Sequence, residues 1–239
     1  MRINKYLALS GVASRRHADN LITCGRVKIN GKIVKTLGVA VDEQSDIIKV
    51  DGKIVSPETG TYYLMMNKPT GCLVSTKDPH HANLVTEYLK EYKGKVFPVG
   101  RLDYDSSGLL IFTNDGDLAF RLSHPRYGVK KTYEVVCNGV IDEPALKKLQ
   151  DGVMLDDGLT APAKVKAIQR DKTSNIVHIT IHEGRKRQVR RMFKKVGLTV
   201  SSLKRIAYGN LKLGNLPGGK FVKIDKKHLK ILQNSVGLK

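Results

Sequence analysis

The sequence predicts an α+β protein in which a small N-terminal module precedes a larger domain. Three observations support this prediction: a helix and two hairpin signals within residues 1–54, a polar linker at 55–61, and alternating strand and helix patterns over 62–239. The chain has 239 residues, of which 41% are hydrophobic, and is therefore long enough for two hydrophobic cores. No apolar run approaches the roughly 18 residues of a transmembrane helix.

Basic residues greatly outnumber acidic ones. The 42 Lys and Arg residues against 22 Asp and Glu residues give a formal net charge of +20. This excess favours a polyanionic partner, for which nucleic acid is the first choice. An anionic membrane surface is the second choice, but no basic amphipathic helix with exposed aromatic residues supports it. The third interpretation is a generally basic surface that has no functional role.

The cysteines indicate a reducing compartment. Cys24, Cys72 and Cys137 are odd in number and far apart, which argues against a disulfide framework. The first five residues lack the apolar centre of a signal peptide, so we expect a cytoplasmic protein. The adjacent His80 and His81 have no third ligand nearby, and we expect no metal site.

The N-terminal module begins with a predicted helix. Ser14 is placed to cap a helix that runs to about Thr23, and Gly25 ends it. Arg15 and Arg16 lie in the first turn, where cations are unfavourable to the helix dipole. A phosphate partner would explain two arginines at this position.

Two turn signals follow this helix. Strands are predicted at 27–29, which contains Lys28, and at 32–34; Asn30-Gly31 joins them, and Asp51-Gly52 forms a second tight turn. The stretch RINKYLALSGVASRRHADNLITCGRVKINGKIV resembles the alpha-L RNA-binding motif, which occurs in a small-subunit ribosomal protein, tyrosyl-tRNA synthetases and RNA-modifying enzymes. The resemblance implies RNA contacts by Arg15, Arg16 and Lys28.

The larger domain contains short predicted elements separated by turns. Strands are predicted at 62–66, 109–112, 130–137 and 176–181, with further short strands between 203 and 224. Helices are predicted at 84–92, 117–122, 144–150 and 225–233. The 109–112 strand is predicted to be the centre of this domain, because its four consecutive apolar residues indicate burial on both faces.

Two patterns in this domain predict functional side chains. Arg101 and Asp103 precede the 109–112 strand on a loop. This position predicts that they belong to a functional site; the alternative is a surface ion pair that caps a turn. Tyr133 shares one strand face with Val135 and Cys137 and is therefore predicted to point inward or into a cleft; a core tyrosine is the alternative.

A basic stretch, EGRKRQVRRMFKK at 183–195, becomes helical after its glycine. Arg190 lies about 100° from the centre of the apolar stripe, at its border, so it is predicted to reach into a cleft; a solvated basic face is the alternative. The stripe consists of Val189, Met192, Phe193 and Val196.

Four motifs of the larger domain occur together in order. They are NKPTG at 67–71, GRLDYDSSGLLIFTNDG at 100–116, HPRYGVKKTYEV at 124–135 and EGRKRQVRRMF at 183–193. With the N-terminal motif they resemble one family of ribosomal RNA pseudouridine synthases, whose A type acts on small-subunit RNA and whose B type acts on large-subunit RNA. Two departures are Ser106, where the family usually has threonine, and Arg187, where some members have histidine.

The resemblance implies a mixed, largely antiparallel sheet with a central cleft. It implies that Asp103 is the catalytic aspartate, that Tyr133 packs against the target uracil and that Arg190 pairs with the aspartate. Leu203 would shape the pocket, and Arg101 would fill the gap left by an extruded nucleotide. Further substrate contacts are expected from Lys68 and Arg187.

The implied activity is the isomerisation of a uridine in ribosomal RNA to pseudouridine, with large-subunit RNA favoured over small-subunit RNA. Asp103 would add to C1′ or remove a ribose proton; the sequence leaves both open. The reaction is redox-neutral, so no cofactor or metal is expected. The expected partner is ribosomal RNA or a precursor of a ribosomal subunit, and the protein is expected to be a monomer. The alternative is a non-catalytic RNA-binding or ribosome assembly protein.

Overall fold

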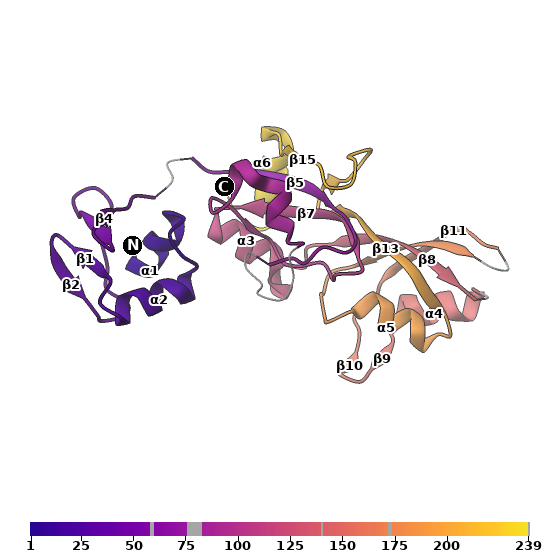
Figure 1. Cartoon of the computed structure of the whole chain (residues 1–239). Helices are drawn as coiled ribbons and strands as arrows, with labels where there is room; N and C mark the ends of the chain where they lie inside the picture. Colours follow the sequence, from indigo (N-terminus) through magenta and orange to yellow (C-terminus); the bar gives the residue numbers. More distant parts are fainter. Residues whose placement is uncertain (58–59, 76–82, 140, 172–173, 239) are drawn as a thin grey trace. The chain divides into compact units, whose positions relative to one another are not determined.

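The structure, a computed structural model, describes residues 1–57, 60–75, 83–139, 141–171 and 174–238 (Figure 1). It divides into two compact units, Met1–Tyr62 with Glu91–Phe97, and Tyr63–Lys90 with Pro98–Lys239. His80 and His81 lie outside the described residues. None of the described helices combines the length and apolarity that a membrane crossing requires.

The first unit packs two helices on a small antiparallel sheet. In sheet order the strands are β2 (Lys32–Val34), β1 (Val27–Ile29), β3 (Ile48–Val50) and β4 (Lys53–Ile54). The predicted helix is confirmed as α2 (Arg15–Thr23), where Ser14 Oγ accepts a hydrogen bond from the His17 N–H at 3.3 Å. Asn30 and Gly31 have φ values of +48° and +82°, which confirms the predicted hairpin turn.

A further helix, α1 (Ile3–Leu9), was not predicted. Its N-cap residue, Arg2, makes no side-chain capping bond, so the sequence contains no start signal. The helix is held instead by burial, because Ile3 and Leu7 are fully buried in the core of this unit. The Tyr6 hydroxyl donates to the Val55 carbonyl at 3.2 Å, so contacts within the unit continue beyond residue 54.

The second unit is built on a nine-stranded sheet. Its main path runs in the order β11 (Lys164–Gln169), β12 (Asn175–Ile181), β8 (Lys131–Asn138), β13 (Thr199–Tyr208), β7 (Ser107–Thr113), β5 (Tyr63–Lys68) and β15 (Phe221–Lys223). The short strands β14 (Leu211–Lys212) and β6 (Phe97–Pro98) pair with β13 and β7. Among the described strands of this sheet, β13 and β7 pair in parallel and the other registered pairs are antiparallel, in agreement with the predicted sheet.

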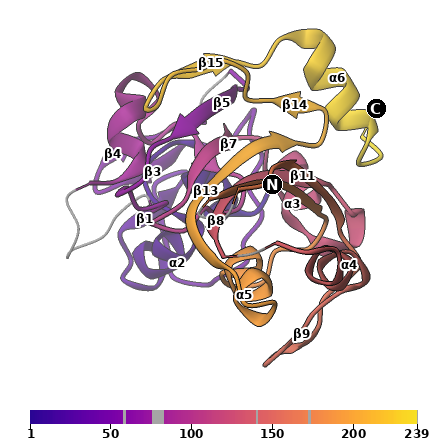
Figure 2. The same ribbon diagram turned by 90° about the vertical axis from the view of Figure 1, so that its right-hand side faces the viewer.

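Two hydrophobic cores flank the junction of β13 and β7. One joins α4 (Glu143–Asp151) and α5 (Gln188–Lys195) to β8, β12 and β13. The other joins α3 (Gly116–Ser123) and α6 (Lys226–Asn234) to β7. Figure 2 shows β13 running through the middle of the unit. The remaining elements are the 3₁₀ helices η1 (Val85–Tyr92) and η2 (Pro125–Tyr127) and a hairpin of β9 (Met154–Leu155) and β10 (Gly158–Leu159).

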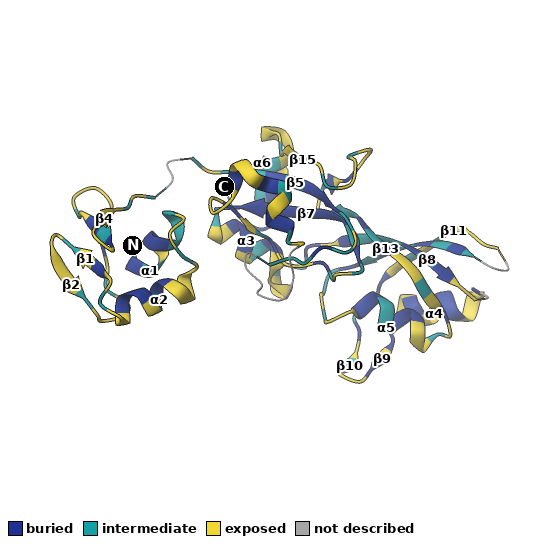
Figure 3. Cartoon of the chain, in the orientation of Figure 1, coloured by how far each residue is buried: buried dark blue, intermediate teal, exposed yellow. Residues whose placement is uncertain are grey.

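The central strand β7 is buried as predicted. Leu109, Leu110, Ile111 and Phe112 are all fully buried, and Figure 3 shows burial along most of the strand. The parallel contact with β13 requires Gly108, which has a φ of +106°. A Cβ at this position would lie 2.3 Å from the Arg205 carbonyl oxygen, so only glycine lets the strands approach.

Two predicted elements of the second unit take a different form. The ten-residue strand β13 begins at Thr199, whereas short strands from about 203 were expected; register shifts after Val200 and Arg205 interrupt its alternation and hide it from a period-two pattern. The expected helix at 84–92 is a 3₁₀ helix with non-helical angles at Leu89.

Candidate active site

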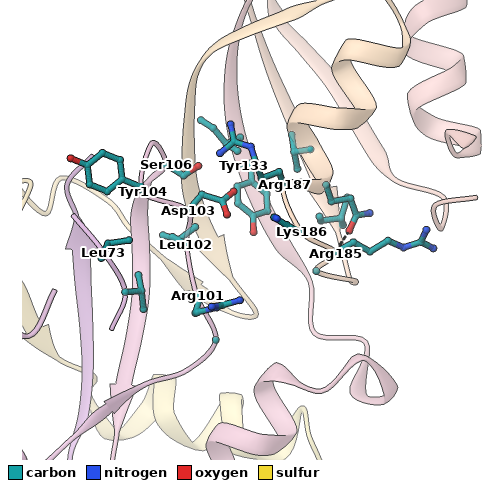
Figure 4. A pocket seen from close by; sticks show the side chains of 17 residues that line it. Leu73, Arg101, Leu102, Asp103, Tyr104, Ser106, Tyr133, Arg185, Lys186 and Arg187 are labelled. Atoms are coloured by element: carbon teal, nitrogen blue, oxygen red, sulfur yellow. Dashed lines mark hydrogen bonds between the residues drawn. The ribbon is translucent and has the colours of Figure 1, made fainter. Parts of the chain in front are cut away.

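A cavity of about 590 Å³ opens beside the junction of β13 and β7 (Figure 4). Its wall is assembled from five segments that are distant in the sequence: residues 73–74, the 100–106 loop, β8, residues 181–189, and β13. Asp103, Tyr133 and Leu203 each line it. Its volume is suited to a single nucleotide or another small ligand.

The carboxylate of Asp103 lies on a turn in this wall. The Ser106 N–H donates to the Asp103 carbonyl at 3.1 Å, which closes the turn. Asp103 is partly buried, and Figure 4 shows its carboxylate directed toward the Tyr133 ring. The turn directly precedes the rigid strand β7, so the carboxylate is attached to the best-buried element of the unit.

Lys68 holds this turn from inside the protein. Its fully buried ammonium group donates to the carbonyls of Pro69 (2.9 Å), Asp103 (3.1 Å) and Ser106 (2.8 Å). Burial lowers the pKa of Lys68. The predicted substrate contact by Lys68 is therefore wrong, because all three N–H donors are occupied by backbone oxygens.

Tyr133 and Leu203 reach the cavity from neighbouring strands. On β8, Val135 and Cys137 are fully buried and Tyr133 packs against the same core, as the alternation predicted. On β13, Leu203 lies opposite Val135 in the register. Tyr133 therefore combines a packed ring with access to the cavity.

Arg190 reaches the loop beside the cavity but does not contact Asp103 in the described structure. Its side chain is only 13% exposed; Nη2 donates to the Asp105 carbonyl at 2.9 Å, Nη1 donates to the Val200 carbonyl at 3.1 Å, and Nε lies 3.3 Å from the Asp105 carboxylate. The predicted partner is thus corrected from Asp103 to Asp105. The reason is the turn, which directs Asp103 to the cavity and Asp105 to α5.

Arg187 completes the contact between this loop and α5. Both of its terminal nitrogens donate to the Asp105 carboxylate, at 2.9 and 2.8 Å, although Arg187 also lines the cavity. The hydrogen bond with Arg187, together with the charge of Arg190, lowers the pKa of Asp105. Arg187 adopts a left-handed conformation with a φ of +50° at the start of α5.

Arg205 is a buried residue of this region that the sequence analysis missed. It is 3% exposed, its Nε donates to the Leu109 carbonyl at 2.7 Å, and its Nη1 lies 3.5 Å from the Tyr133 hydroxyl. It is placed opposite Tyr133 in the register and two residues after Leu203. That spacing was the available signal, because residues two apart on a strand share a face.

Basic side chains surround the cavity. Arg101 is exposed on its wall and is joined there by Arg185, Lys186 and Arg187. In the first unit Arg15, Arg16 and Lys28 are all exposed. Such cations can bind phosphate groups. Among the described residues no group of three or more His, Cys, Asp or Glu side chains is arranged to hold a metal ion.

Comparison with known proteins agrees with this geometry. Residues 62–195 match the RNA pseudouridylate synthase family and residues 1–48 match the S4 domain. A Bacillus subtilis protein named ribosomal large subunit pseudouridine synthase B is 46% identical over 220 residues, covering 91% of this chain and 89% of that protein. An Aquifex aeolicus protein described as an uncharacterized RNA pseudouridine synthase is 44% identical over 240 residues, covering 100% and 96%.

A solved structure supports the same assignment. The crystal structure of a pseudouridylate synthase superposes with a TM-score of 0.71 at 30% identity, covering 97% of this chain and 99% of that chain. This match includes both the N-terminal module and the larger domain. The chain therefore belongs to the RNA pseudouridylate synthase family, and it is an RNA pseudouridine synthase with an N-terminal S4 domain.

Proposed function

We propose that this enzyme converts a uridine of large-subunit ribosomal RNA to pseudouridine. The choice of RNA rests on the relatives: proteins of Bacillus subtilis and Haemophilus influenzae named ribosomal large subunit pseudouridine synthase B are 46% and 38% identical to this chain. We further propose that the protein acts as a cytoplasmic monomer.

The observation that carries the proposal is the convergence of Asp103, Tyr133 and Leu203 on one cavity from three separate elements. A carboxylate, an aromatic ring and an apolar side chain are what the reaction requires. The ring and the leucine provide packing surface for a flat uracil, and the carboxylate faces the same space. Asp103 is proposed as the catalytic residue, with Tyr133 and Leu203 holding the base.

The chemistry is an intramolecular exchange of one bond for another. The N1–C1′ bond breaks, uracil turns and C5 joins C1′; the proton on C5 passes to solvent and N1 takes up a proton, so the product is an isomer of the substrate. C1′ becomes electron-poor during cleavage, as in glycoside hydrolysis, and an adjacent carboxylate stabilises that charge. Asp103 either adds to C1′ or removes a ribose proton. The reaction is redox-neutral, so we propose no cofactor.

Access to C1′ requires that the target nucleotide leave its helix, which costs a few kcal/mol. Phosphate contacts supply free energy against this cost. We assign these contacts to Arg15, Arg16 and Lys28 in the S4 domain, whereas Arg101 at the cavity is proposed to fill the gap left by the extruded nucleotide. Arg187 and Arg190 act differently: through Asp105 they position the turn that carries Asp103.

Replacement of the aspartate tests the proposal. Asp103→Asn is expected to remain folded and bind RNA but release no tritium from 5-tritiated uridine in large-subunit ribosomal RNA, because the amide is neither nucleophile nor base. Asp117→Asn, which alters an exposed carboxylate of α3 paired with Arg121, is the matched control and should retain turnover. Mapping pseudouridines in both ribosomal RNAs, from cells with and without the gene, identifies the modified RNA and the position.

Turnover by Asp103→Asn near that of the unmodified protein would refute the proposed role of Asp103. Loss of a pseudouridine from small-subunit RNA alone would refute the assigned RNA. If RNA binding persisted but no pseudouridine depended on the protein in either RNA, the alternative of a ribosome assembly protein would be supported instead.

A further inference from the structure

A hydroxyl group in the wall of the cavity has no partner. Ser106 is 1% exposed and lines the cavity with Asp103 and Tyr133. Its backbone is fully used, because the N–H donates to the Asp103 carbonyl and the carbonyl accepts from Lys68. Ser106 Oγ, in contrast, has no hydrogen bond with any part of the chain that the structure describes. Buried polar groups are nearly always hydrogen-bonded, so this hydroxyl indicates a bond that forms when the cavity is occupied.

The position of Ser106 indicates which part of the target nucleotide it would meet. Asp103 and Ser106 are the first and last residues of one turn, and Figure 4 shows their side chains directed to the same side, toward Tyr133. In the proposed reaction Asp103 must reach C1′ or a ribose proton, whereas Tyr133 packs against uracil. In that arrangement a hydroxyl on the same turn as Asp103 would lie nearer to the ribose than to the base.

We propose that Ser106 Oγ hydrogen-bonds the 2′-hydroxyl of the target uridine and so selects ribose over deoxyribose. The inference rests on the proposed function. The 2′-hydroxyl is bonded to C2′, the carbon next to C1′, and it can both donate and accept, as can serine. A contact at this atom is the means by which a protein distinguishes RNA from DNA. Because the hydroxyl is unpaired in the free protein, its removal should not lower stability.

The test measures RNA binding without turnover. Ser106→Ala, Ser106→Thr and Ser107→Ala are each made in the Asp103→Asn protein. Dissociation constants are measured by fluorescence anisotropy for two ribosomal RNA fragments, which carry uridine or 2′-deoxyuridine at the mapped target position. Ser107 is the matched control because it is the neighbouring serine and does not line the cavity.

Ser106→Ala should weaken binding of the uridine RNA about 5- to 10-fold, as expected for one lost hydrogen bond, and change binding of the deoxyuridine RNA less than about twofold. Ser106→Thr, which keeps the hydroxyl, should preserve the preference for uridine. Ser107→Ala should leave both dissociation constants unchanged.

Equal losses for the two RNAs, or no loss for either, would overturn the proposal. So would a melting temperature for Ser106→Ala more than about 3 °C below its parent, since that would show a bonded hydroxyl in the free protein. Tritium release by the protein with Asp103 intact tests the proposed function separately. A failure of the Ser106 assignment is therefore distinguishable from a failure of the function.

Discussion

Arg190→Ala should destabilise the protein much more than Arg191→Ala, although the two residues are adjacent on α5. The Arg190 guanidinium donates to the carbonyls of Asp105 and Val200, and its side chain is 13% exposed. A hydrogen bond from a charged donor contributes roughly 1.5 kcal/mol, and two lost bonds therefore cost about 3 kcal/mol. We add nothing for the ion pair, because the Asp105 carboxylate is 42% exposed and solvent screens it.

Arg191 is a matched control of the same type on the same helix. It makes a two-pronged pair with Asp157, at 2.9 Å for both bonds, but that carboxylate is 47% exposed. Exposed pairs contribute roughly 0.2–1 kcal/mol, so the expected difference in unfolding free energy between the two variants is about 2 kcal/mol or more.

Urea denaturation followed by circular dichroism measures this difference, and tritium release measures its effect on turnover. Arg190→Ala should also lower kcat, because the loop that it holds carries Asp103. Arg190→Lys keeps the charge but loses the planar geometry that serves two carbonyls, so an intermediate loss is expected. Equal destabilisation by the two alanine substitutions would refute the reasoning, as would an Arg190→Ala protein with unchanged stability.

Three further predictions concern pH, packing and RNA binding. Burial, with a smaller contribution from Arg205, lowers the pKa of Lys131 from 10.5 to about 8. Between these pH values the unfolded chain binds a proton at Lys131 that the native protein does not, so the free energy of unfolding should rise with pH from 8 to 10.5. Lys131→Met should flatten that rise in thermal unfolding measured across this range, and an unchanged slope would contradict the assigned cause. Gly108→Ala places a Cβ 2.3 Å from a β13 carbonyl and should prevent formation of the parallel pair, seen as loss of soluble folded protein, whereas Gly116→Ala, with open space around it, should be tolerated. The double substitution Arg15→Ala, Arg16→Ala should make the slope of log binding constant against log salt concentration shallower, by an amount equivalent to up to about two phosphate contacts, without changing kcat at saturating RNA. An unchanged slope would show that these residues do not contact the RNA.

Much of the local structure could be predicted because its causes are local. Ser14 caps α2 through the N–H of His17, three residues away, and Asn30-Gly31 makes its hairpin turn through its own backbone angles. The apolar residues 109–112 require burial wherever the strand is placed. The stripe on α5 predicted which face is buried, since Val189, Met192 and Phe193 all lie in the core.

The four motifs predicted more of the candidate site than the local hydrophobic and turn patterns did. The order of the four motifs indicates the family, and the resemblance points to Asp103, Tyr133 and Leu203, which all line the cavity. The cavity itself depends on contacts between segments that no local pattern relates. Asp103 and Tyr133 are 30 residues apart in the sequence and meet because β13 lies between β7 and β8.

The tertiary structure alone decided the partners of the charged residues. Arg190 is 85 residues from Asp105, Lys68 is 38 from Ser106 and Arg205 is 96 from Leu109. A buried cation needs hydrogen-bond acceptors, and this need can be inferred from the sequence. Which carbonyls lie within hydrogen-bonding distance depends on how distant segments pack together. The parallel register of β13 with β7 places Arg205 beside Gly108, and the turn before β7 directs Asp103 and Asp105 to different neighbours. The sequence by itself therefore determined the elements that carry local start, stop and turn signals and the chemical types in the site, whereas the pairing of distant strands determined which side chains face the cavity and which hold its wall.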